Sequence, residues 1–218
     1  MNIYSYSIRI YKTKKRFWKT MRKQPKQQRA KMIVDGILQA TQQCIAEYGL
    51  AGLTTPKIAE CSGVGVGSIY QYFENKEQIV EELLLRKSES LGLRLKQMVM
   101  EKQSIHDIIP SSIQFGFDVM REDKGFFIEI LKYWHNYNNS NAAKILEKHF
   151  FELGLYVFNR FYRHWDFEML KNKSFVIINS TLFTMMRYVS NNEFLISEQE
   201  LKRELSAMIL AYLDHENE

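Results

Sequence analysis

Apolar residues recur every three or four positions along most of this chain, which is the period of an amphipathic helix. The first run spans residues 26–48, and Gly49 can end it. A longer run covers residues 75–98 and begins with a capping-box pattern, because Gln78 follows Asn75 by three positions. Further helices are predicted at about residues 105–122, 125–137, 141–166, 173–190 and 198–214.

Two short helices joined by a glycine turn are predicted between the two long runs. We expect Thr55 to be the N-cap of the first, because its hydroxyl can accept from free backbone N–H groups and Pro56 suits the N1 position. That helix then covers residues 56–61, Gly63 supplies the positive φ of the turn, and the second helix covers residues 66–72. This arrangement is a helix-turn-helix, a motif whose second helix enters the major groove of DNA.

The predicted fold class is all-α, because no alternating run of β-branched residues with hairpin signals occurs. An N-terminal three-helix head is joined by a long helix to a larger helical body, and no flexible linker separates the two.

Positive charge is concentrated at the amino end. Residues 1–34 carry eleven Lys and Arg and no acid, whereas the remainder carries 19 bases and 25 acids. A basic arm beside a DNA-reading unit would add phosphate contacts through counterion release. Two alternatives stay open: the arm serves only solubility, or Met21 is the first residue of the native chain.

Other function classes lack the residues that they need. The string GVGVGS from Gly63 resembles a nucleotide-binding loop, but no strand precedes it. Five scattered histidines have no metal-ligand spacing, and Cys44 and Cys61 lack a CxxC partner, so both cysteines are interpreted as small core residues. No signal peptide or membrane-spanning run is present. We therefore expect no catalysis, cofactor, metal site or membrane association, and a cytoplasmic location.

The string SGVGVGSIYQYFENKEQI resembles the signature of the TetR/AcrR family of bacterial transcriptional regulators, with its Gly-Val turn, aromatic trio and lysine. The resemblance covers about residues 26–84. It implies that the recognition helix enters the major groove and that Phe73 anchors the head to the long helix. The DNA-contacting residues implied are Thr55, Lys57, Gly65, Val66, Gly67, Ser68, Tyr70, Gln71, Tyr72 and Lys76.

The chemistry of single residues supports parts of this set. Gln71 suits bidentate pairing with adenine, and the hydroxyls of Tyr70 and Tyr72 suit phosphate oxygens. An alternative for Tyr70 is a core position, by its periodicity with neighbouring apolar residues. Gly65 departs from the Ser or Thr that commonly caps this helix in the family, and Gly67 costs about 1 kcal/mol relative to alanine. We expect close approach of the Gly67 backbone to the groove.

The body is rich in aromatic residues, with 18 of the chain's 29 between Phe115 and Tyr188. Such residues suit either a plain helical core or a cavity for an apolar or cationic small molecule, which family members hold as an inducer. The candidate ligand-binding residues are Phe115, Asp118, Phe127, Trp134, His135, Phe158 and Tyr162.

Dimerisation is expected because one short recognition helix reads too few bases for specificity. Residues 175–189 are apolar nearly all round, which predicts burial on several sides, and Ser197 with Glu200 opens the last helix. In the family, two C-terminal helices per subunit form the dimer interface.

The sequence thus predicts a basic, disordered arm at residues 1–25, a helix-turn-helix DNA-binding domain at 26–73 and a ligand-binding and dimerisation domain at 74–218. The main hypothesis is a dimeric repressor that binds a palindromic DNA operator and that a small-molecule inducer releases. The alternative is a DNA-binding dimer whose body binds a partner protein or no ligand.

Overall fold

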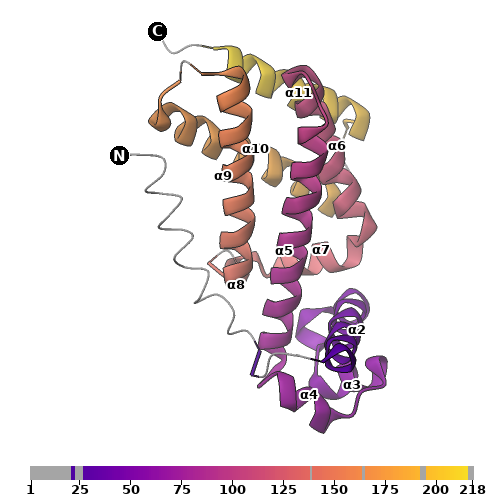
Figure 1. Cartoon of the computed structure of the whole chain (residues 1–218). Coiled ribbons are helices and arrows are strands. Elements are labelled where there is room, and N and C mark those ends of the chain that lie inside the picture. Colours follow the sequence, from indigo (N-terminus) through magenta and orange to yellow (C-terminus); the bar gives the residue numbers. More distant parts are fainter. Residues whose placement is uncertain (1–20, 23–26, 138, 164, 192–194, 216–218) are drawn as a thin grey trace. The chain divides into compact units, whose positions relative to one another are not determined.

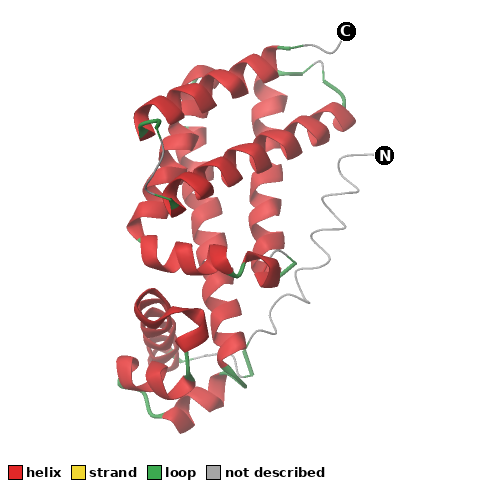
Figure 2. Cartoon of the chain, turned by 180° about the vertical axis from the view of Figure 1, so that it is seen from behind, coloured by secondary structure: helices red, strands yellow, loops and turns green. Residues whose placement is uncertain are grey.

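A computed structural model describes the chain apart from residues 1–20, 23–26, 138, 164, 192–194 and 216–218 (Figure 1). The helices, in order, are α2 (Gln28–Gly52), α3 (Thr55–Ser62), α4 (Val66–Tyr72), α5 (Lys76–Met100), α6 (Ile105–Glu122), α7 (Lys124–Lys132), α8 (Trp134–Tyr137), α9 (Asn141–Phe161), α10 (Phe167–Ser190) and α11 (Glu198–Asp214). Figure 2 shows only helices and loops among the described residues, so the all-α prediction is confirmed.

The chain divides into two compact units. The first holds the described residues up to Ser88 together with Gly125–Ile145, and the second holds Glu89–Lys124 and the described residues from Leu146 onward. The helix-turn-helix therefore shares its unit with α7, α8 and the first half of α5. Among the helices of the described residues, none has both the length and the apolar character that crossing a bilayer requires.

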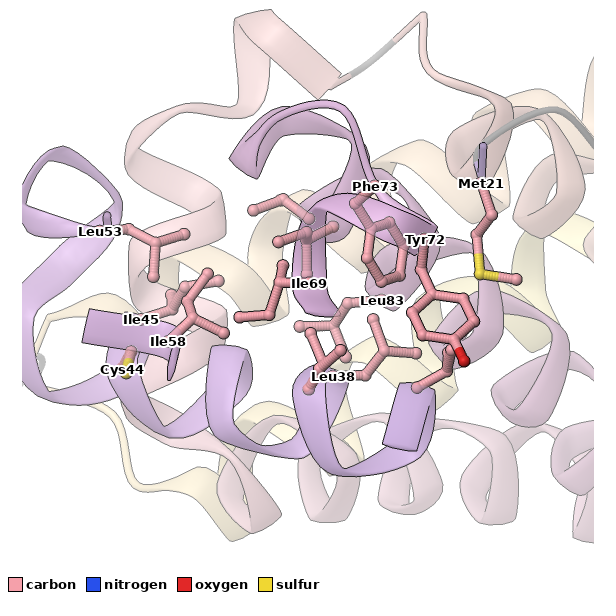
Figure 3. Close-up of a cluster of buried hydrophobic side chains, with 14 of the residues drawn as sticks. Met21, Leu38, Cys44, Ile45, Leu53, Ile58, Ile69, Tyr72, Phe73 and Leu83 are labelled. Carbon is pink, nitrogen blue, oxygen red and sulfur yellow. The ribbon is translucent and has the colours of Figure 1, made fainter. Parts of the chain in front are cut away.

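One apolar core holds the first unit together (Figure 3). Leu53, Ile58, Ile69 and Phe73 are at most 1% exposed. They come from the C-cap of α2, from α3, from α4 and from the C-cap of α4. The core also includes residues of α5 and α7, namely Ile79, Val80, Leu83, Phe126 and Ile130. The recognition helix α4 is therefore fixed from behind by side chains that lie far apart in the sequence, and the predicted anchoring role of Phe73 agrees with its burial.

The turn chemistry of the head follows the sequence closely, with one correction. Gly63 has φ 67°, as predicted, and α4 covers the predicted residues 66–72. The N-cap of α3 is Thr54 and not Thr55: the Thr54 hydroxyl accepts from the Lys57 N–H at 3.3 Å, while Thr55 is the first helical residue and is buried. Helix α2 reaches Gly52, but Gly49 interrupts it with φ 70°.

Some of the helices after α5 have the predicted bounds, and others differ from the prediction at their ends. Helices α6 and α11 have the predicted bounds, and the capping box of Ser197 with Glu200 is confirmed. Helix α10 begins six residues early, because the Asp166 carboxylate accepts from the Met169 N–H at 2.7 Å and caps it. The predicted helix at 141–166 ends at Phe161, and the predicted helix at 125–137 is divided into α7 and α8.

Helix α10 combines a buried side with an exposed apolar side. Lys173 is 3% exposed, donates to the carbonyls of Tyr212 and His215 at the end of α11, and lies over the Trp165 ring. By contrast, Phe175, Val176 and Phe183 are 68%, 46% and 47% exposed. The prediction of burial on several sides is therefore wrong for the single subunit, because these three side chains remain substantially exposed among the described residues. We call Phe175, Val176 and Phe183, with Met208 of α11 at 45% exposed, the α10 apolar face.

Glu129 of α7 ties that helix to the end of α2. Its carboxylate accepts from the Leu50 N–H at 3.1 Å and pairs with Lys132, and it lies where a Cβ on Gly49 would be only 2.7 Å away. The hydrogen bond from Lys132 lowers the pKa of Glu129 below its ordinary value, burial opposes this, and the Leu50 N–H adds to the lowering.

A Glu129→Gln substitution is expected to destabilise the chain by about 1–2 kcal/mol at neutral pH, because the amide is a weaker acceptor than the carboxylate. The lowered pKa adds stability that is complete above about pH 4.5, the ordinary value. That stability is lost as the pH falls through the folded-state pKa. Urea unfolding of the whole chain from pH 7 to pH 3 should show a smaller loss for the variant than for the wild type.

Glu168→Gln is the matched control, because Glu168 pairs with Lys171 at the same three-residue spacing but is 76% exposed. We expect this change to cost less than about 0.5 kcal/mol. Equal effects of the two substitutions would contradict a specific role of Glu129.

Candidate nucleic-acid interface

Helix α4 has one exposed face and one buried face. Ile69 and Tyr72 are 1% and 8% exposed and belong to the core, whereas Val66 and Tyr70 are 37% and 44% exposed. Gly65, Gly67 and Gln71 are also exposed, and Ser68 is partly exposed. The residues that the sequence assigned to base contacts thus share an accessible surface, which a duplex could reach without unfolding the head.

The two tyrosines of the motif have different environments. Tyr72 is a core residue, packed in the same cluster as Met21 and Leu83 (Figure 3). Tyr70 is exposed, so the alternative of a core position for Tyr70 is wrong. The spacing of Ile69, Tyr72 and Phe73 is i, i+3, i+4, and this signal would have placed Tyr72 inside and Tyr70 outside.

The two predicted lysines bind the loop between α2 and α3. The Lys57 ammonium donates to the Gly52 carbonyl at 3.0 Å and lies 4.5 Å from the Tyr48 ring centroid. The Lys76 ammonium donates to the Leu53 carbonyl at 2.9 Å. Both side chains are partly exposed, so they position the loop and still add positive charge beside α3.

The backbone at the start of α4 is exposed and, among the described residues, has no side-chain cap. Gly65 occupies the N-cap position, no described side chain caps the helix, and the Gly65 carbonyl accepts from the N–H groups of Ser68 and Ile69. A Cβ added at Gly67 would meet no described atom within 4 Å. The glycines are thus not required by packing within the head.

A Gly67→Ala substitution is expected to stabilise the chain by about 0.5–1 kcal/mol, because alanine loses less conformational entropy in a helix. If the missing Cβ allows the backbone close to a duplex, the same change should weaken DNA binding by about fivefold or more. Chemical unfolding and fluorescence anisotropy with labelled DNA measure the two effects.

Gly36→Ala in α2 provides the control, since a Cβ there would also meet no described atom within 4 Å. It should give a similar gain in stability and no change in DNA affinity. If Gly67→Ala also left DNA affinity unchanged, close backbone approach would be the wrong explanation for this glycine.

The two cysteines lie at the back of the helix-turn-helix. Cys44 of α2 is buried, as predicted, but Cys61 of α3 is exposed, so the interpretation of both as core residues is wrong. Their Sγ atoms are 3.0 Å apart. Seventeen positions separate the two cysteines, and sequence spacing gave no sign of their proximity. No group of three metal-ligating side chains occurs within the described residues.

The predicted ligand-binding residues fall in both units. Phe115 and Asp118 of the second unit line an open groove of about 720 Å³. Phe158 and Tyr162 belong to the same unit but are buried, with ring centroids 5.6 Å apart. Burial raises the pKa of Tyr162 to about 12, with a further contribution from Asp214.

The other predicted ligand-binding residues belong to the first unit. Phe127 packs against the head core and lies edge-to-face with Phe126, at 5.7 Å between ring centroids. Trp134 and His135 form the start of α8.

The groove also contains residues that the sequence did not indicate. Its walls combine apolar and cationic side chains from α5, α6, α11 and the segment after α5. Besides Phe115 and Asp118, the lining residues are Met98, Lys102, Pro110, Ser111, Gln114, Lys202, Arg203 and Ser206. Asp118 accepts from Gln114 and Arg121, so its charge is partly compensated. Lys202 pairs with Glu198 and donates to the Gln114 amide oxygen at 2.8 Å, and Arg203 pairs with Glu204. The groove thus combines three cations, two of them already paired with a carboxylate, with one acid and an apolar wall.

Comparison with known proteins places the head in a family of regulators. The model for bacterial regulatory proteins of the tetR family matches residues 37–83, from α2 into α5. The chain is 32% identical over 92 residues to the fatty acid metabolism regulator protein of Bacillus subtilis (strain 168). That match covers 42% of this chain and 47% of the relative, so it spans about half the relative's length.

Solved structures resemble the chain over most of its length. The fatty acid degradation regulator FadR from Bacillus halodurans has a TM-score of 0.65 at 20% identity, covering 84% of this chain and 97% of that one. FadR from Bacillus subtilis, solved in complex with stearoyl-CoA, has a TM-score of 0.62 at 21% identity, with 82% and 96% covered. At these identities the likeness shows a shared fold.

Proposed function

We infer from the match of residues 37–83 that this chain is a transcriptional regulator of the TetR family of bacterial regulatory proteins, with a helix-turn-helix. On this premise we propose that it is a homodimeric repressor of a palindromic operator. The observation that carries the proposal is the division of α4 into a core face and an exposed face. A helix fixed from behind can present Gln71, Ser68 and Val66 to base edges.

The α10 apolar face supports the dimer. Three exposed apolar side chains lie within nine positions of α10, and Met208 of α11 is also exposed. Symmetric association with a second copy would remove such apolar side chains from water. A symmetric pair of heads would read two half-sites and so require dyad symmetry in the DNA.

The groove of the second unit supports a ligand with an apolar chain and an anionic head. Lys102, Lys202 and Arg203 favour phosphate groups, and Met98 and Phe115 offer apolar contact. A related fold is known with stearoyl-CoA, a molecule of this chemistry. We therefore replace the expected apolar or cationic inducer with a long-chain acyl-CoA.

Ligand binding would change the DNA affinity through helices that continue between the units. Helix α5 runs without a break from the head core into the second unit, and α7, which packs into the head core, follows α6 directly in sequence. A ligand that favours one position of these helices would alter the separation of the two heads, and by linkage DNA would weaken ligand binding by the same factor.

Selection of DNA from a random pool by the purified full chain tests the function. We expect enrichment of sequences with dyad symmetry, and Gln71→Ala should lose about 1–3 kcal/mol of preference at one symmetric base position. Gln97→Ala, at an exposed site of α5, is the control and should select the same sequence. Failure to enrich any sequence, or enrichment without symmetry, would contradict the proposal.

Thermal unfolding with stearoyl-CoA, coenzyme A and stearate tests the ligand. Stearoyl-CoA should raise the Tm most and release the selected duplex, and Lys202→Glu should weaken both effects about tenfold or more by reversing a charge at the groove. Lys171→Glu, which is 55% exposed on α10 and outside the groove, is the control. Indifference to all three molecules would favour the alternative, a body that binds a partner protein or no ligand.

A further inference from the structure

The two thiols of this chain lie in contact between α2 and α3. Cys44 and Cys61 are its only cysteines, and their Sγ atoms are 3.0 Å apart although they belong to different helices. A disulfide requires an S–S separation of about 2.05 Å, so closure needs a movement of only about 1 Å. We propose that Cys44 and Cys61 are a redox-modification site, which a peroxide converts into an intrachain disulfide that weakens DNA binding.

The two sulfurs differ in their access to a reagent. Cys61 is exposed near the end of α3, whereas Cys44 is 0% exposed and donates its S–H to Cys61 and, at 3.8 Å, to the Lys57 carbonyl. Burial and then the hydrogen bond with Cys61 raise the pKa of Cys44 to about 12. Because the thiolate is the nucleophile, Cys61 is the residue that meets the peroxide, and Cys44 is the residue that resolves the product.

The reaction balances with hydrogen peroxide as the oxidant. The Cys61 thiolate attacks one peroxide oxygen, the O–O bond breaks and hydroxide leaves, which gives a sulfenic acid at Cys61. The Cys44 sulfur then attacks the Cys61 sulfur, the S–O bond breaks, and the departing hydroxide takes the Cys44 proton as water. Two thiols and one peroxide thus give one disulfide and two waters, and a dithiol reductant reverses the change by exchange.

The position of the bond links it to DNA reading. Cys61 is followed by Ser62, whose hydroxyl accepts from the Val64 N–H in the turn, and then by Gly63 with its left-handed φ. Drawing Cys61 toward α2 by about 1 Å would therefore shift the turn that sets α4, and binding geometries tolerate errors of only about 0.5 Å. This consequence rests on the function proposed above, whereas formation of the bond does not.

The test measures the bond and the DNA affinity separately. The full chain is treated with hydrogen peroxide, its remaining free thiols are alkylated with iodoacetamide, and its mass is measured by intact mass spectrometry. We expect a species that has lost two hydrogens and takes up no iodoacetamide, and that dithiothreitol returns to two free thiols. Alkylation of both cysteines after peroxide treatment would overturn the proposal.

Affinity is then measured by anisotropy with the duplex enriched by the reduced protein. The oxidised chain should bind the duplex at least about tenfold more weakly and should regain its affinity with dithiothreitol. Peroxide should leave the affinity of the Cys61→Ser variant unchanged. Cys44→Ala should accumulate a sulfenic acid at Cys61 that dimedone labels. A disulfide with unchanged affinity would overturn the regulatory role. If the reduced chain enriched no duplex, the repressor function would fail, while the mass spectrum would still decide the modification site.

Discussion

Replacing Phe175 with glutamate is expected to convert the proposed dimer into a monomer and to weaken operator binding about 100-fold or more. Burying a phenylalanine side chain stabilises an interface by about 1.5–3 kcal/mol. Both subunits of a two-fold symmetric dimer carry the substitution, so this stabilisation is lost twice. A buried, unpaired carboxylate adds a further cost. Because Phe175 is 68% exposed in the single subunit, the fold of that subunit should be unaffected. Sedimentation velocity and anisotropy with the selected duplex measure the two losses.

Leu93→Glu is the matched control, because Leu93 is 62% exposed on α5 and lies outside the α10 apolar face. It should leave both the mass in solution and the DNA affinity close to those of the wild type. A dimeric Phe175→Glu variant with full affinity would show that subunits associate through some other surface.

The second large effect is expected from Tyr72→Ala, which should destabilise the chain by about 3–5 kcal/mol by leaving a cavity in the head core. Tyr72 is 8% exposed and shares this core with Ile69 and Phe73. Urea unfolding followed by circular dichroism gives the free energy, and loss of DNA binding should follow the loss of folded protein.

Tyr70→Ala separates binding from folding. Its side chain is 44% exposed, so the change should alter stability by less than about 0.5 kcal/mol. If the Tyr70 hydroxyl donates to a phosphate, DNA affinity should nevertheless fall about tenfold, and Tyr70→Phe should reproduce most of that loss. Equal destabilisation by Tyr70→Ala and Tyr72→Ala would contradict the division of α4 into two faces.

Much of the head could be predicted because its signals are local. Periodicity and a single glycine located the turn and gave the bounds of α4. The predicted N-cap of α3 was wrong by one residue. Thr54 and Thr55 have identical side chains, and only the packing of the head buries Thr55 and leaves Thr54 to cap the helix. The helix at 173–190 was predicted too short because its aspartate cap lies seven residues upstream, in a stretch of mixed polar and apolar residues that resembles a loop.

Contacts between distant segments could not be predicted in the same way. Glu129 meets Leu50 across 79 positions, and Arg94 pairs with Glu122 across 28. Glu129, Arg94 and Glu122 are ordinary charged residues in their own helices, and Leu50 contributes only its backbone N–H, so no local pattern marks these partners. For the same reason no sequence pattern indicated the groove cations, which come from α11 and the segment after α5. The expectation of an apolar or cationic ligand rested on the aromatic residues alone.

Met21 and Arg22 decide where the amino-terminal segment departs from the head. Met21 is 7% exposed in the core that contains Tyr72, and the Arg22 N–H donates to the Tyr72 carbonyl at 2.6 Å. Six positive charges precede Met21 in the sequence, so the chain that carries them joins the described residues beside the last residue of α4. Twenty residues span at most about 70 Å even when fully extended. A duplex seated on α4 would therefore lie within the span of the segment that carries these charges.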